Sequence, residues 1–160
     1  MTAALFGDTF YWIALADFND GAHRRAVALT FERADSTIVT TDEVLAEYLT
    51  FFATAPEQVR RKAVTNAQRI LDNRGVRVVP QSRQSFLSGM ALYGARPDKG
   101  YSLTDCISMQ TMRREGADRG ANQRSPLRAG RVSRAFSGVM KQAERGGQLL
   151  RSGIKFYSRV

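Results

Sequence analysis

Three acidic residues far apart in the sequence stand where their carboxylates could share a metal ion. Asp8 follows a short apolar run, Glu47 lies one turn into a predicted helix, and Asp105 lies in the first turn of another. Carboxylates repel one another unless a cation is present, and a hard divalent ion such as Mg²⁺ prefers oxygen ligands. Such an ion lowers the pKa of an attacking water and stabilises negative charge at a phosphodiester transition state. The three residues therefore predict metal-assisted phosphodiester chemistry.

The predicted elements alternate between strand and helix, an order that brings such residues to one edge of a sheet. Short apolar or β-branched runs predict strands at residues 3–6, 36–40 and 76–79. Helical periodicity and capping residues predict helices at residues 9–15, 23–33, 42–52, 55–71, 82–93 and 102–114. This order predicts an α/β fold with a parallel sheet, right-handed crossovers and helices on both faces. Ligands of such sheets bind at the carboxyl ends of the strands.

Each of the three acids also has a purely structural explanation. Asp8 is a favoured N-cap for the helix that follows it, and this role alone would account for it. Glu47 borders the apolar stripe of its helix, so its carboxylate could point inward as a ligand or reach water. Asp105 follows Ser102 at the spacing of a capping box. Only the shared position of all three acids favours a site.

Positive charge is concentrated in the last quarter of the chain. The formal net charge is +9, yet residues 1–116 carry 14 Lys and Arg against 13 Asp and Glu, whereas residues 117–160 carry 10 against 2. The periodic patterns also end near Gly116, and only a weak helix is suggested around residues 136–150. We therefore predict a domain at residues 1–116 and a basic tail at 117–160. RNA binding, disorder and out-of-frame sequence are three interpretations of this tail, and we favour the last two.

Cysteine and histidine are too scarce to suggest other chemistry. The single Cys106 can form no disulfide within the chain, and with the single His23 it cannot form a zinc site of the usual kind. We interpret both as structural residues. No apolar stretch is long enough to cross a membrane and no secretory signal is evident, so we expect a cytoplasmic protein without membrane contact.

Three segments resemble successive motifs of PIN-domain nucleases, particularly the VapC-type toxins of bacterial toxin–antitoxin pairs. In the order of the family's motifs, they are Phe6-Gly7-Asp8-Thr9, Thr41-Asp42-Glu43-Val44-Leu45-Ala46-Glu47 and Asp98-Lys99-Gly100-Tyr101-Ser102-Leu103-Thr104-Asp105-Cys106. The third segment is the most specific, because it combines a loop acid, a serine cap and a second acid at fixed spacing. The resemblance covers about residues 4–116.

This resemblance implies a three-layer α/β/α PIN-like fold and a metal-dependent ribonuclease. Asp8, Glu47 and Asp105 would be the catalytic residues and the ligands of one or two Mg²⁺ or Mn²⁺ ions. The substrate would be single-stranded RNA or RNA loops. A small antitoxin would be the protein partner, and toxins of this type often form homodimers.

The family pattern has a fourth acid, in a threonine-x-aspartate motif that closes a further strand, and we identify no counterpart here. Asp118 has no apolar strand before it, so we do not transfer the role to it and expect the last strand to be missing. Residues 116–136 can be encoded by a DNA sequence with suitably chosen synonymous codons. When that DNA is read in a neighbouring frame, it encodes a peptide that resembles the usual C-terminal end of the family. We hypothesise that a frameshift near codon 116 produced the basic tail; gene codons incompatible with that second frame would refute this.

A second class of function stays open beside the enzyme. A PIN-like remnant without the fourth acid would bind an antitoxin or RNA and cut nothing. A phosphatase that forms an aspartyl-phosphate is disfavoured, because no second aspartate lies two residues after Asp8, and no glycine-rich phosphate loop occurs. Metal-dependent cleavage of RNA distinguishes the nuclease from the remnant.

Overall fold

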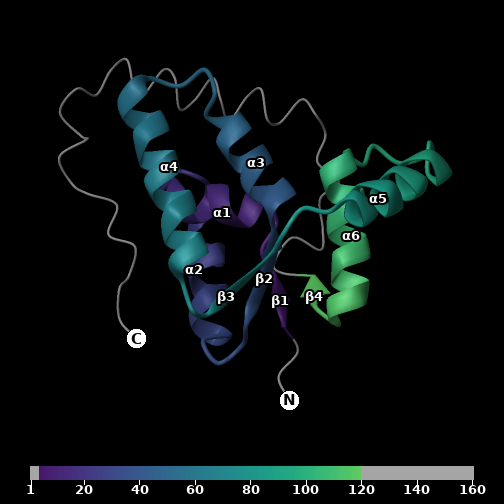
Figure 1. The fold of residues 1–160 in the computed structure, drawn as a ribbon. Helices are drawn as coiled ribbons and strands as arrows, with labels where there is room; N and C mark the ends of the chain where they lie inside the picture. Colours follow the sequence, from purple (N-terminus) through teal and green to yellow (C-terminus); the bar gives the residue numbers. More distant parts are fainter. Residues whose placement is uncertain (1–3, 120–160) are drawn as a thin grey trace. The chain divides into compact units, whose positions relative to one another are not determined.

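A parallel sheet forms the centre of the fold. The computed structural model describes residues 4–119, and the strands of this part are β1 (Leu5–Phe6), β2 (Ile38–Thr41), β3 (Val76–Val79) and β4 (Asp118–Arg119). All pairings are parallel, in the order β3-β2-β1-β4 (Figure 1). Leu5 of β1 is in register with Ile38 of β2 on one side and with Asp118 of β4 on the other. The predicted α/β class with a parallel sheet is confirmed.

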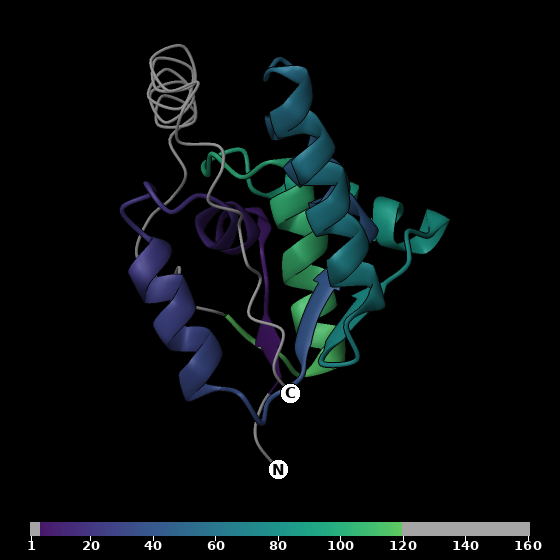
Figure 2. The same ribbon diagram turned by 90° about the vertical axis from the view of Figure 1, so that its left-hand side faces the viewer.

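Helices follow each of the first three strands and cover both faces of the sheet. The helices of the described part are α1 (Thr9–Ala16), α2 (His23–Glu32), α3 (Asp42–Phe51), α4 (Glu57–Asp72), α5 (Arg83–Ala95) and α6 (Leu103–Glu115). In Figure 2, α2 and α4 lie in front of the strands and α6 lies behind them. Helix α3 contacts α1, α4 and α6, so it joins the first half of the domain to the second. Each helix lies where the sequence predicts one.

Strand β4 corrects the expectation that the last strand is missing. Helix α6 ends at Gly116, whose φ of 60° is a left-handed conformation that glycine adopts readily, and the chain then runs into β4 beside β1. Backbone hydrogen bonds alone can form so short a strand, which is why residue types did not predict it. Strand β4 lies just beyond the predicted boundary at residue 116. Residues 120–160, with most of the predicted tail and the weak helix at 136–150, lie outside the described part.

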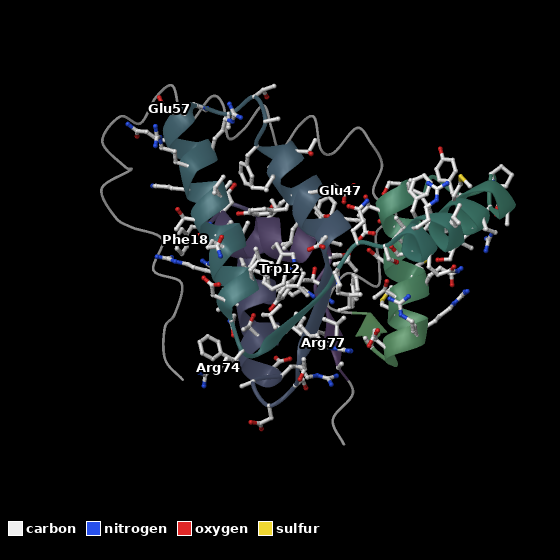
Figure 3. The ribbon with its side chains drawn as sticks, in the orientation of Figure 1. Trp12, Phe18, Glu47, Glu57, Arg74 and Arg77 are labelled. Carbon is white, nitrogen blue, oxygen red and sulfur yellow. The ribbon has the colours of Figure 1, made fainter. Side chains whose placement is uncertain are left out.

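The apolar core lies between the sheet and the helices. Trp12, Val39, Val44, Tyr48 and Ile70 are almost fully buried in it, and Figure 3 shows Trp12 in the interior between α1 and the strands. These side chains hold α1, α3 and α4 against the sheet. Within residues 4–119, no helix is long and apolar enough to cross a membrane.

Candidate functional site

Asp8 lies at the carboxyl end of β1, in a turn that buried polar contacts hold in place. The Gly7 carbonyl accepts hydrogen bonds from the Thr40 hydroxyl at 2.8 Å and from the Trp12 indole nitrogen at 3.1 Å. A Cβ atom on Gly7 would lie 2.9 Å from the Trp12 ring, so a residue without a side chain is required here. Asp8 then caps α1, because its Oδ1 accepts a hydrogen bond from the Tyr11 amide at 2.8 Å.

Glu47 lies on α3, the helix that follows β2. The Thr41 hydroxyl caps this helix by accepting a hydrogen bond from the Val44 amide at 3.2 Å. The buried Thr9 hydroxyl donates a hydrogen bond to Oε2 of Glu47, while Oε1 has no hydrogen-bond partner within residues 4–119. Glu47 is half-buried, and Figure 3 shows it on the side of α3 that faces α5 and α6. The structure thus directs Glu47 inward.

Asp105 lies in the first turn of α6 and forms the predicted capping box. The Ser102 amide donates a hydrogen bond to Oδ2 of Asp105 at 2.8 Å, and the Asp105 amide donates one to the Ser102 hydroxyl at 3.0 Å. Oδ1 of Asp105 has no hydrogen-bond partner in the part of the chain that the structure describes. Capping therefore uses one carboxylate oxygen, and the other remains available to a ligand.

The three carboxylates are close enough to affect one another electrostatically. Burial raises the pKa of Glu47, the Thr9 hydrogen bond lowers it, and the negative charges of Asp105 and Asp8 raise it again. Three separate elements, the turn after β1, α3 and α6, supply these charges. The fold therefore concentrates negative charge at the carboxyl edge of the sheet, where a cation would relieve the repulsion.

A hard divalent cation fits the chemistry of these donors. Asp105 and Glu47 each keep a carboxylate oxygen without a hydrogen bond within residues 4–119, and all three residues offer oxygen ligands only. In the arrangement as it stands, no three His, Cys, Asp or Glu side chains of residues 4–119 are grouped closely enough to hold an ion. Mg²⁺ requires few protein ligands because it retains several waters, so the donor set suits it without a closed cage.

The other residues singled out from the sequence have structural contacts. Asp98 is exposed and bonds the Arg96 guanidinium at 2.9 Å, which lowers the pKa of the Asp98 carboxyl to about 2. Cys106 is buried in the core, and Nδ1 of His23 pairs with the Ala14 carbonyl at 2.7 Å. Thr9 was given no functional role from the sequence. The only feature that could have indicated one is its hydroxyl group, directly beside Asp8 in the chain.

Comparison with known proteins identifies the fold. No protein-family model matches the chain, and no curated protein matches it. Among solved structures, it is similar to VapC20 of Mycobacterium tuberculosis, a toxin that cleaves the sarcin-ricin loop, with a TM-score of 0.64 and 25% sequence identity. The match covers 82% of this chain and 95% of VapC20. The described domain thus has the PIN-like α/β fold that the motifs imply.

Proposed function

We propose that this chain is a toxin-like endoribonuclease that hydrolyses RNA phosphodiester bonds with the help of Mg²⁺ or Mn²⁺. The observation that carries the proposal is the electrostatic coupling of Glu47 with Asp105 and Asp8 at the carboxyl edge of a parallel sheet. Similarity to a toxin that cleaves the sarcin-ricin loop supports RNA as the substrate. A small antitoxin, a second copy of the chain and a cytoplasmic location belong to the same proposal.

Asp8, Glu47 and Asp105 would hold the metal ion. When bound, the ion would lower the pKa of a water molecule and stabilise the charge that develops on the phosphate. The chain itself prepares the carboxylates for this task. Capping contacts fix Asp8 and Asp105, and Thr9 holds Glu47 and favours its ionised form.

The direct test is cleavage of a structured RNA by the purified full chain with Mg²⁺, with Mn²⁺ and with EDTA. Asp8→Asn removes the charge of Asp8 but keeps a favoured N-cap, so a loss of activity cannot be assigned to a lost cap. We expect cleavage to fall by at least about 100-fold, the upper end of what is lost with an outer-shell partner of a metal. Asp98→Asn, which changes an exposed acid outside the cluster, is the matched control and should leave cleavage unchanged. Asp8→Asn cutting as well as wild type would refute the assignment.

The second candidate is a PIN-like remnant that binds an antitoxin or RNA without cutting. Two observations favour it: no fourth acid is identified, and no three acids within residues 4–119 converge on one point. Wild-type protein that binds RNA yet leaves it intact with both metals would establish this candidate in place of the nuclease.

A further inference from the structure

An exposed arginine lies at the same edge of the sheet as the acids. Among the four residues that follow each of β1, β2 and β3, Arg83 is the only basic one. It makes no ion pair or side-chain hydrogen bond within residues 4–119, unlike Arg61, Arg77 and Arg96. A polyanion brought to an acidic site needs nearby positive charge to hold it, and the charge of Arg83 is not neutralised by a described neighbour.

Two hydrogen bonds fix the start of α5 beside the helix that carries Glu47. The Gln81 amide donates to the Asp42 carboxylate at 2.9 Å, and the Ser85 hydroxyl donates to the Glu43 carboxylate at 3.0 Å. Glu43 precedes Glu47 on α3 by four residues, which is about 6 Å of rise. The segment that carries Arg83 is therefore held next to the candidate active site.

The surface at this point is hollowed and suits a nucleotide. An open hollow of about 420 Å³ is lined by Gln81, Ser82, Arg83 and Phe86. The Arg83 guanidinium lies over the Phe86 ring, 5.7 Å from its centre. A planar cation beside an aromatic ring can contact a phosphate and offer a stacking face to a base, which is how many proteins bind single strands.

We propose that this hollow is a subsite for single-stranded RNA next to the bond that is cut. Arg83 binds a phosphate of the strand, and a base lies against the Arg83 and Phe86 side chains. This assignment rests on the proposed ribonuclease function and adds to it the place where a flanking nucleotide is held.

The test measures binding of a labelled single-stranded RNA to the full chain in EDTA, over a series of KCl concentrations. One lost phosphate contact should reduce the slope of log K against log salt by about 0.7 and weaken binding roughly fivefold at 0.1 M salt. Arg74→Gln is the matched control for Arg83→Gln, because Arg74 is also exposed but precedes β3, at the end of the sheet away from Glu47 (Figure 3). The control should leave the slope unchanged.

A second variant separates stacking from charge. Phe86→Leu should weaken binding by at least about fivefold without changing the salt slope, because base stacking carries no counterion release. Circular dichroism verifies that this variant is folded. A Phe86→Leu chain that is folded and binds RNA as tightly as wild type would overturn the stacking role.

The outcomes for the subsite and for the nuclease can be told apart. Equal effects of Arg83→Gln and Arg74→Gln, or no effect of either, would overturn the subsite even if the protein cuts RNA with a metal. Wild-type protein that neither binds nor cuts RNA would overturn both proposals.

Discussion

The buried hydroxyl of Thr9 donates a hydrogen bond to the carboxylate of Glu47, which lies 38 residues further along the chain. This bond joins the first residue of α1 to the middle of α3. It opposes the burial and the neighbouring charges that raise the pKa of Glu47, so it favours the anionic form that a metal ligand requires.

Thr9→Val should weaken both Mn²⁺ binding and RNA cleavage by about 10- to 100-fold, the range typical of residues that position a metal ligand. Valine has nearly the same shape but cannot donate a hydrogen bond. Titration calorimetry with Mn²⁺ measures binding independently of activity. Thr9→Ser keeps the hydroxyl and should retain most of the Mn²⁺ binding and most of the RNA cleavage. A Thr9→Val variant that binds Mn²⁺ like wild type would show that Thr9 does not position Glu47.

Gly89→Ala should destabilise the domain by about 1–3 kcal/mol because α5 and α6 approach too closely for a side chain there. A Cβ atom on Gly89 would lie 2.3 Å from Cγ1 of Ile107 and 3.2 Å from its backbone nitrogen. Gly94, in the same helix, has no atom within 4 Å of such a Cβ, so Gly94→Ala should be neutral or stabilising by up to about 1 kcal/mol. Urea denaturation measures both, and equal effects would contradict the close packing.

Thr40→Val should cost about 0.5–1.5 kcal/mol, the usual contribution of a hydrogen bond, since it removes the bonds of the Thr40 hydroxyl and leaves the Gly7 carbonyl paired with the Trp12 indole nitrogen alone. The fully buried Thr40 hydroxyl donates to the Gly7 carbonyl and lies 3.2 Å from the Trp12 indole nitrogen, which donates to it. Thr50→Val is the control, because the Thr50 hydroxyl is exposed and bonds only its own helix; we expect a change within about 0.5 kcal/mol. If chemical denaturation finds the two variants equally stable, the buried network contributes nothing.

Arg77→Gln should reduce stability at neutral pH but hardly at acidic pH. The hydrogen bond from the Arg77 guanidinium lowers the pKa of Glu115, burial opposes this shift, and Arg114 reinforces it. A carboxyl with a lowered pKa in the folded state adds stability above its ordinary pKa of about 4.3, and this stability is lost as the pH falls through the lowered value.

Because Arg77 is about half exposed, the pair should contribute no more than about 1 kcal/mol at pH 7. Unfolding free energies of both chains between pH 7 and pH 3 should converge below about pH 4. Arg74→Gln, which removes an exposed arginine without a described ion pair, should show no such convergence. A constant difference between Arg77→Gln and wild type across this range would exclude the ion pair as the cause.

Most elements of the domain were predictable because their signals are local. The caps Asp8, Thr41 and Ser102 act within three residues, and helical or strand periodicity is complete within one element. The alternating order then selects a parallel sheet, which places the residues after its strands at one edge. Residue types and order therefore predicted an α/β fold with a parallel sheet and indicated that Asp8, Glu47 and Asp105 share one edge of it, whereas the PIN-like class was implied by the resemblance of three motifs.

Only the tertiary structure decided what depends on contacts between distant segments. Sequence patterns left Glu47 free to face inward or outward; packing of α3 against α1 and α6 turned it toward Thr9 and Asp105. Strand β4 likewise forms through backbone pairing with β1, which requires no particular side chains. Periodicity records which face of an element is apolar, but not which element covers that face, because that choice depends on the shape and charge of the whole assembled core.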